Sequence, residues 1–418
     1  MSGANKPKSK KPAYAFADMI APVSEETFFA DYYGKKPLHI PATKKNAARF
    51  GNVMPWDTLN TILNMTGIWS GTSLLLVLDK KPVDPADYCR PGIDRNNVSV
   101  MQPDPAKVHA FLARGATLVC NDIDTLTADL RAIADTLENT LDAKVQGNLY
   151  CSWKQRQGFD AHFDTHDVFA VHVEGEKMWN LYEGCHEAPI AHPRFRNFSK
   201  QFLADEHGPV MEQVLMRPGD LLYIPRGWYH DALASSEGTV HIAFGATSVI
   251  GLDLFGLLYE AAVEDPLFRT ALPRRAEGEA ALRAHLGALG DRLGDLAKAG
   301  PMRAGLAAHQ DAHRYDRGGF DLPAEAANPR LTLTASDFTL KTASGGAVLA
   351  GPKGAVPVPP GNADMVAWVL DAGEAGPAGA AGFTRQAFDR AFPKATAAAR
   401  DELIDALIAM KVLAVTGG

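Results

Sequence analysis

Cysteines are few in this sequence, and none of them form a short-spaced pair. The 418 residues include four, which are Cys89, Cys120, Cys151 and Cys185. No two of them stand in a CxxC arrangement, which excludes the usual cysteine-based zinc and redox motifs. A chain of this length with four scattered cysteines is typical of a reduced, intracellular protein.

Long apolar runs are missing as well. No stretch is long and apolar enough to span a membrane. The start of the chain carries lysines but no apolar segment ahead of a cleavage site, so it does not resemble a secretory signal. We interpret its basic segment NKPKSKKP (5–12) as a disordered, solubilising tail. These absences predict a cytoplasmic protein with no membrane partner.

The sequence also lacks a net basic charge. It has 42 Lys and Arg against 49 Asp and Glu, which gives a formal net charge of -7. Proteins that bind nucleic acid along a broad surface are basic, so we do not expect nucleic acid as a direct substrate. The composition, 46% hydrophobic and 22% charged, is that of a globular protein.

The order of patterns along the chain predicts a β-rich centre between helical regions. Two helices are expected within 24–65, with Ser24 as an N-cap. The segment 126–141 has the apolar spacing of an amphipathic helix. Between 145 and 250, short β-branched or aromatic runs alternate with Gly, Pro and Asp, and VEGEK (173–177) reads as a hairpin turn. Many short strands at regular intervals favour a barrel or jelly roll.

The last third of the chain returns to helix and then to a small mixed domain. Five leucines follow a heptad-like spacing, and they are Leu282, Leu286, Leu289, Leu293 and Leu296. Interspersed glycines weaken this segment as an isolated helix, so it needs a packing partner. We expect a homodimer formed through about residues 251–300. Beyond it, 330–342 looks like a strand region, and two helical segments follow.

One short stretch, DAHFDTHDVF (160–169), carries the chemistry. On a strand, His162 and Asp164 point to the same side and could bind one ion, which would compensate for their burial. The later motif PGDLLYIP leads into a loop that ends at His230, our third ligand. Two histidines and one carboxylate on one face are the ligand set of non-haem Fe(II) sites that keep positions open. A second His-x-Asp, at 309–311, has no supporting strand and is treated as chance.

Two long motifs identify a family. NLYCSWKQRQGFDAHFDTHDVFAVHVEGEKMWNLY (148–182) and PGDLLYIPRGWYHDA (218–232) resemble the JmjC-type, cupin-like 2-oxoglutarate- and Fe(II)-dependent oxygenases, most closely the ribosomal-oxygenase branch. The resemblance implies a mainly β fold with helical additions, built on a double-stranded β-helix (jelly-roll) core. The domains it implies are a disordered basic tail (1–23), the JmjC/cupin oxygenase domain (24–250), a helical dimerisation region (251–325) and a winged-helix-like C-terminal domain (330–418).

The same resemblance assigns roles to individual residues. The iron ligands would be His162, Asp164 and His230. Lys177 would pair with the distal carboxylate of 2-oxoglutarate, which needs a charge partner inside a barrel. Asn148 and Tyr150 would line the cosubstrate and substrate side of the pocket.

The implied function is the hydroxylation of a side chain in a protein or peptide, with O₂ and 2-oxoglutarate as cosubstrates. A ribosomal-protein-like Arg or His is the target that the resemblance favours. The alternatives are an N-methyl-lysine demethylase of the same chemistry, a cupin-group isomerase or dioxygenase that does not need 2-oxoglutarate, and a non-catalytic cupin-like binding or adaptor module. The motif does not separate the first two, because demethylation of this kind begins with hydroxylation of the methyl group.

Several positions depart from the family pattern. His172 stands where relatives usually carry Gln, and His166 replaces another residue type. We expect both, together with His241, to be core residues or neighbours that orient a ligand. Trp228 and Tyr229 are bulkier than usual beside the third ligand. The predicted recognition-like helix of the C-terminal domain has no basic excess, which favours a protein-contact role there.

Overall fold

The protein is described by a computed structural model. It covers residues 14–416 apart from 94–98, 154–157, 197, 236–237, 319–329, 336, 344–345, 352–353 and 374–381. The chain divides into two compact units, Met1–Asp316 and Arg317–Gly418. The basic segment 5–12 lies outside the described residues. Among the described residues, none of the helices combines the length and apolar character needed to cross a bilayer.

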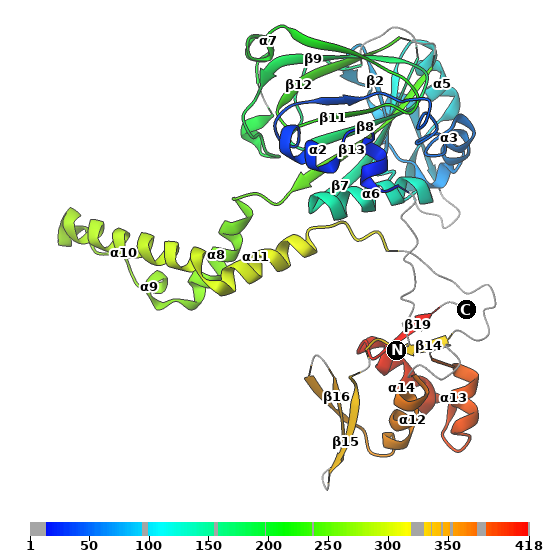
Figure 1. Cartoon of the computed structure of the whole chain (residues 1–418), viewed down its shortest axis with the longest axis vertical. Helices are drawn as coiled ribbons and strands as arrows, with labels where there is room; N and C mark the ends of the chain where they lie inside the picture. The colour runs from blue at the N-terminus through cyan, green and yellow to red at the C-terminus, as the bar shows by residue number, and fades with distance from the viewer. Residues whose placement is uncertain are drawn as a thin grey trace, which may run out of the picture. The chain divides into compact units, whose positions relative to one another are not determined.

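Two antiparallel sheets form the barrel of the first unit (Figure 1). The strands of the large sheet are, in spatial order, β1 (Leu38–Ile40), β11 (Leu221–Ile224), β8 (Asp167–Glu174), β13 (Thr239–Ser248), β7 (Ala143–Ser152), β6 (Thr117–Cys120), β2 (Leu74–Leu78) and β3 (Lys81–Pro82). The small sheet has the order β10 (Val210–Met216), β9 (Lys177–Cys185) and β12 (Trp228–Ala234). The mainly β core expected from the sequence is confirmed.

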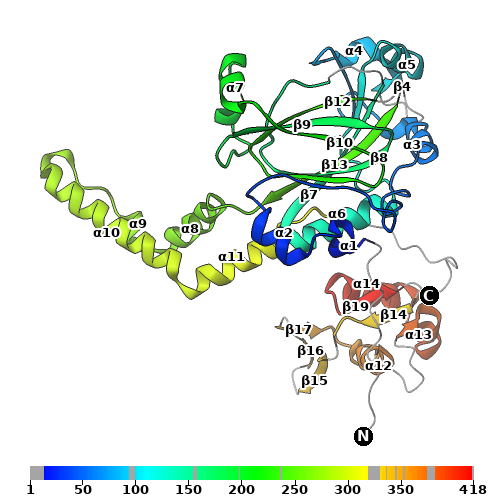
Figure 2. The same ribbon diagram turned by 45° about the horizontal axis from the view of Figure 1, so that its top comes forward.

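Helices cover the outer face of the large sheet (Figures 1 and 2). They are α1 (Phe16–Ile20), α2 (Glu25–Asp31) and α6 (Ala128–Leu141). The prediction of α6 is confirmed, since its apolar stripe is buried and the Thr127 side chain caps its start. Ser24 caps α2, as expected. The range 1–23 is not a tail throughout, because the side chains of Phe16, Met19 and Ile20 are buried in the main core.

Shorter elements complete this part of the chain. They are α3 (Trp56–Leu63), η1 (Thr66–Ile68), α4 (Pro85–Tyr88), β4 (Cys89–Ile93), β5 (Ser99–Pro103), α5 (Pro105–Ala113), η2 (Pro193–Phe195) and α7 (Lys200–His207).

Strand alternation decides which side chains face the barrel interior. On β8, Phe169 and Val171 enter the core beneath the helices, while Val168 and Ala170 enter a second core between the two sheets. Because β8 is buried on both faces, its residues 168–171 are all apolar. On β9, Lys177 lies on the same face as Trp179 and Leu181, which belong to the core between the sheets.

The segment VEGEK is a tight turn but does not form a hairpin. Gly175 has a φ of +67°, which suits the turn. The strands on either side belong to different sheets, with β8 pairing β11 and β13, and β9 pairing β10 and β12. The turn therefore carries the chain from one wall of the barrel to the other, and the prediction of a hairpin was wrong.

Helices follow the barrel in the first unit. They are α8 (Asp253–Glu264), α9 (Pro266–Arg269), η3 (Arg275–Glu277), α10 (Gly278–Lys298) and α11 (Gly300–Ala312). The α8, α10 and α11 helices pack on one another. The end of α11 returns to the barrel, where the His313 ring bonds the carbonyl of Thr247 at 2.9 Å. The leucine-rich segment is a helix, as expected, and its glycines are accommodated on an exposed surface.

The second unit has its own core and is described by itself. Its strands are β14 (Arg330–Leu333), β15 (Thr339–Ala343), β16 (Gly346–Gly351), β17 (Gly354–Val358), β18 (Phe383–Thr384) and β19 (Leu413–Thr416), and its helices are α12 (Ala363–Gly373), α13 (Arg385–Ala391) and α14 (Ala397–Ala409). Val366, Val369, Phe388 and Ile404 are fully buried in its core. Its winged-helix-like character and the four-part domain division stay predictions, and the split at 316/317 falls inside the range 251–325.

Candidate metal centre

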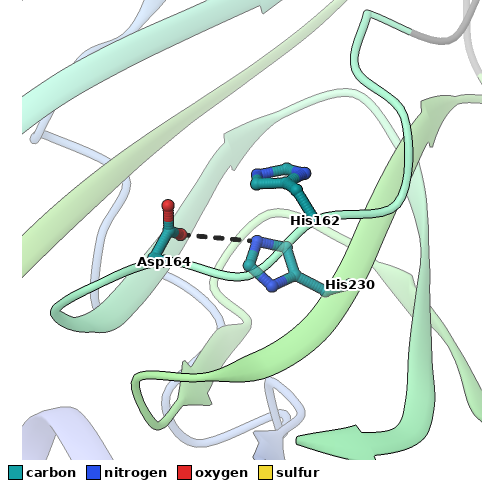
Figure 3. A group of neighbouring side chains, drawn as sticks. All are labelled: His162, Asp164 and His230. Carbon is teal, nitrogen blue, oxygen red and sulfur yellow. Dashed lines mark ion pairs between the residues drawn. The ribbon is translucent and has the colours of Figure 1, made fainter. Parts of the chain in front are cut away.

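Three predicted ligands converge at the mouth of the barrel (Figure 3). One ligand atom from each of His162, Asp164 and His230 lies within 4.8 Å of the others. The Nε2 atom of His230 is 3.5 Å from a carboxylate oxygen of Asp164. Among the described residues, this is the one cluster of His, Cys, Asp and Glu side chains with metal-ligand geometry. His309 and Asp311 lie on α11 instead.

Backbone hydrogen bonds fix the spacing of these ligands. His162 and His230 form an isolated antiparallel bridge and exchange both N–H···O bonds, at 3.1 and 2.8 Å. The carbonyl of Asp164 accepts from the N–H of Gly227 at 2.9 Å. The segment 162–164 is therefore not a regular strand, because β8 begins only at Asp167. His230 lies on β12 and not in a loop, which corrects the expectation for that residue.

Gly227 makes this arrangement possible. Its φ is +89°, a backbone conformation that residues other than glycine rarely adopt. A Cβ atom added there would lie 2.1 Å from the carbonyl oxygen of His186. The N–H of His186 in turn donates to the Gly227 carbonyl at 2.9 Å. The backbone conformation at Gly227, whose N–H donates to the Asp164 carbonyl, therefore requires a residue without a side chain.

Both histidine rings are oriented by backbone carbonyls. The Nδ1 atom of His162 is 2.8 Å from the carbonyl oxygen of Asp160, and the Nδ1 atom of His230 is 3.0 Å from that of Trp228. If each Nδ1 carries the proton for these bonds, each Nε2 presents a lone pair toward the common centre. This tautomer is the one a metal-binding histidine needs.

The electrostatics also suit a cation. Burial opposes the ionised form of Asp164, but the neighbouring His230, His162 and His166 rings together hold the pKa of that carboxyl below its usual value. Burial, followed by repulsion from His162, lowers the pKa of His230 to about 4. At neutral pH the cluster therefore contains a carboxylate and a neutral His230 ring, which are the protonation states of metal ligands.

An aromatic clamp holds the residue between the first two ligands. The ring of Phe163 stacks on His186 at 4.8 Å and meets Tyr229 edge-on at 5.2 Å. Glu206, on α7, joins the two partners, since it lies 2.8 Å from His186 Nδ1 and accepts from the Tyr229 hydroxyl at 2.5 Å. Sequence reasoning missed this clamp because its members are far apart in the chain.

Lys177 is buried in the same cavity as the three ligands. Its side chain is 6% exposed, and burial lowers its pKa to about 8. Among the described residues it forms no ion pair, and its Nζ atom is 5.9 Å from the centroid of the Trp179 ring. A buried ammonium without an anion is costly, so its position in a cavity indicates an anionic ligand.

The other predicted site residues also line this cavity. Asn148 and Tyr150 lie on the inward face of β7. The amide oxygen of Asn148 accepts from the N–H of Asp122 at 3.1 Å, which turns its NH₂ group the other way. The rest of the lining is Thr117, Ser152, Gly158, Phe159, His166, Val168, Trp179, Ala232, His241 and Ala243.

The three additional histidines occupy different places. His166 lies against Gly245, where an added Cβ would stand 2.4 Å from its ring. His172 is fully buried, and its Nε2 atom is 3.0 Å from the carbonyl oxygen of Gly175. His241 is also buried, but unlike His172 it lines the cavity. The expectation of a core position is confirmed for His172 and His241.

Comparison with known proteins agrees with this geometry. The family model described as "JmjC domain" matches residues 120–253, a range that contains all three candidate ligands and Lys177. A bifunctional lysine-specific demethylase and histidyl-hydroxylase NO66 from Drosophila persimilis is 28% identical over 235 residues, covering 55% of this chain and 31% of the relative. Ribosomal oxygenase 2 from Rattus norvegicus is 28% identical over 276 residues, covering 63% of this chain and 55% of the relative.

The chain thus spans 31% and 55% of the length of these two relatives. The crystal structure of ycfD from Escherichia coli has a TM-score of 0.50 at 14% identity and covers 94% of this chain and 98% of its own. At that identity the likeness supports the fold alone. Residues 120–253, which contain the three candidate ligands and Lys177, therefore match the JmjC domain family, and the chain is similar over 55% and 63% of its length to the two relatives.

Proposed function

We propose that this protein hydroxylates a side chain of a protein or peptide. The reaction consumes O₂ and 2-oxoglutarate. One oxygen atom enters a C–H bond of the substrate and the other enters succinate, with release of CO₂. The observation that carries the proposal is the unpaired, buried ammonium of Lys177 in the cavity of the three candidate ligands. A site for metal alone would not need this cation.

The residues present fit both groups. Two rings whose Nδ1 atoms meet backbone carbonyls, plus one carboxylate, are three ligands that would hold an Fe(II) ion and leave positions for other groups. The iron supplies the oxidising chemistry when bound. Lys177 supplies the cation for the far carboxylate of 2-oxoglutarate, and Asn148 directs an amide donor into the same space.

Other residues of the chain hold the three ligands in place and line the cavity. The bridge between His162 and His230 fixes the spacing of two ligands before any ion arrives. The clamp around Phe163 restrains the backbone between His162 and Asp164. The rings of Trp179 and Tyr150 line the cavity, and their low polarity strengthens the attraction between Lys177 and an anion.

The substrate is proposed as a protein because the relatives carry names of protein-modifying enzymes. Peptides of ribosomal proteins with a central Arg or His are the first to test. The name of one relative also includes lysine-specific demethylase, which makes methylated lysine peptides the second set. Nucleic acid is not proposed as a substrate.

The test is an anaerobically purified, iron-loaded protein supplied with O₂, 2-oxoglutarate and each peptide set. We expect succinate formation and a mass increase of one oxygen atom on an Arg or His. Formaldehyde with loss of a methyl group would instead assign the demethylase. A metal-loaded protein that neither binds 2-oxoglutarate nor forms succinate would assign the binding module or a cupin enzyme independent of 2-oxoglutarate.

The assembly proposed for this enzyme is a homodimer. No residue of α10 is buried within the chain, although the helix carries the heptad-like leucines. Large apolar side chains in this region stay exposed, and they are Leu252, Phe255, Tyr259, Val263, Leu272, Leu282 and Leu286. A face of this size left in water is a liability, and pairing with a second copy covers it symmetrically. The cytoplasmic location and the protein-contact role of the second unit stay predictions.

A further inference from the structure

The ring of His241 is held in one plane inside the cavity. It lies between two other rings, stacked on Tyr150 at 5.0 Å and 9° and parallel to His172 at 6.4 Å and 5°. Trp179 meets it edge-on at 5.3 Å. Its side chain is 3% exposed, and β13 places it on the strand face that lines the cavity. The ring therefore has almost no freedom to turn.

This immobile ring has a nitrogen without a hydrogen-bond partner. Within the described part of the chain the Nδ1 atom of His241 is fully buried and has no hydrogen-bond partner. His172, its neighbour in the stack, has at least the Gly175 carbonyl for its Nε2 atom. A buried polar group without a partner loses its hydrogen bonds to water and gains none in return. Native proteins rarely accept that cost unless a ligand or water completes the site.

The charge state of His241 allows it to bind the same carboxylate as Lys177. Burial, followed by repulsion from Lys177 and His172, holds the pKa of His241 well below its usual value. The ring is therefore neutral at physiological pH and presents one N–H donor. A neutral donor does not compete with the Lys177 ammonium for an anion. A carboxylate has two oxygens with about four acceptor positions, so both groups can bind one carboxylate together.

We propose that His241 is a second binding group for the distal carboxylate of 2-oxoglutarate, and that its fixed ring selects the length of the dicarboxylate. This inference rests on the proposed function. Lys177 has a flexible stem and can follow a carboxylate over several positions. The stacked imidazole cannot, so it favours one distance between the metal and the far carboxylate. A 2-oxo acid with one more or one fewer methylene loses the His241 bond and keeps that of Lys177.

The experiment compares two phenylalanine substitutions. His241→Phe keeps an aromatic ring in the stack and removes its polar atoms. His172→Phe is the matched control, because that ring is equally buried, lies in the same stack and does not line the cavity. Mn(II) replaces iron so that no turnover occurs, and calorimetry measures dissociation constants for Mn(II), 2-oxoglutarate and 2-oxoadipate.

We expect His241→Phe to raise the dissociation constant for 2-oxoglutarate by about tenfold, the low end for a hydrogen bond to a charged group. Its preference for 2-oxoglutarate over 2-oxoadipate should fall, and its affinity for Mn(II) should not change. His172→Phe should keep both the affinity and the preference. His241→Gln, which restores a donor, should recover part of the affinity.

Three results overturn the inference. They are an unchanged affinity in His241→Phe, an equal loss in both phenylalanine variants, and a loss of affinity with the length preference intact. If His241→Phe does not fold, histidine-labelled wild-type protein with Zn(II) replaces it. The imidazole nitrogen resonance of His241 is assigned as the one that is missing in His241→Gln. This resonance should shift when 2-oxoglutarate is added, and the absence of a shift would also overturn the inference. Wild-type protein that binds Mn(II) but not 2-oxoglutarate would instead refute the proposed function.

Discussion

Replacing Lys177 with methionine should change ligand affinity and stability in opposite directions. The substitution removes the charge and keeps most of the length of the side chain. A hydrogen bond to a charged group contributes about 1.5–3 kcal/mol, so the dissociation constant for 2-oxoglutarate should rise by about 10- to 150-fold. Without ligand, the buried ammonium destabilises the protein. Its pKa falls from 10.5 to about 8, which corresponds to a cost of about 3 kcal/mol for the charged form.

The sign of the stability change depends on pH. Because the folded-state pKa of Lys177 is lowered, its cost is fully present below pH 8 and disappears as the pH approaches 10.5, where the unfolded chain also loses the proton. Lys177→Met should therefore melt at a higher temperature than wild type at pH 7, without metal or 2-oxoglutarate. The difference should shrink as the pH rises toward 10.

Calorimetry with Mn(II) and 2-oxoglutarate, together with thermal melts of the ligand-free protein, tests both effects. Lys144→Met is the control, since that lysine lies on the barrel strand β7 outside the cavity. An unchanged dissociation constant in Lys177→Met would refute the assignment and make Arg226 the next cation to test. A lower melting temperature would refute the claim that Lys177 is held at a cost to stability.

Alanine at any of the three candidate metal ligands should abolish succinate formation and leave the circular dichroism spectrum intact, and near-normal turnover with metal bound would contradict the ligand assignment. The Michaelis constant for 2-oxoglutarate should be constant below pH 8 and rise by up to about tenfold per pH unit above it, because the Lys177 ammonium has a pKa of about 8 and loses its proton there. A Michaelis constant that stays unchanged up to pH 9.5 would contradict this. Gly227→Ala should destabilise the protein by about 2 kcal/mol or more in denaturant titrations, whereas Gly287→Ala, with nothing within 4 Å of the added methyl, should not destabilise it. Leu286→Glu combined with Leu293→Glu should convert a dimer to a monomer in light scattering while metal binding persists, and a monomeric wild type at micromolar concentration would refute the dimer.

Much of the fold could be predicted from local patterns. The α6 helix has an uninterrupted apolar stripe and a cap, so both its existence and its buried face followed from spacing. The inward position of Lys177 also follows from alternation once β9 is known. The turn at Gly175 was found, but strand pairing was not, because pairing depends on which sheet the next strand joins. The sequence of the turn itself does not show which sheet the next strand joins.

The candidate site divides in the same way. The residue types and their order indicated a metal, and the structure brings His162, Asp164 and His230 together. The strand on which the first two were expected is an irregular segment, held by bonds to a β12 strand that sequence reasoning took for a loop. His241 was expected to be a core residue or a neighbour that orients a ligand, because a sequence does not show that a buried ring lacks partners. Such a deficit is visible only when every neighbour is known.

The pairing of β12 with β9 is irregular at its start, and the register of β12 determines which metal ion the protein can bind. The pairing with β9 shifts between Trp228 and His230, and beyond this shift the His230 ring faces the cavity while Asp231, on the opposite face of the strand, is buried and bonds Asn180 and Tyr182. A slip of one residue would exchange the two. Such a slip would turn every side chain of β12 to the opposite face, and the cavity would then offer two carboxylates and one imidazole, a harder ligand set that favours magnesium or manganese over iron. The register of one strand thus determines the chemical hardness of the ligand set as well as the packing of the sheet.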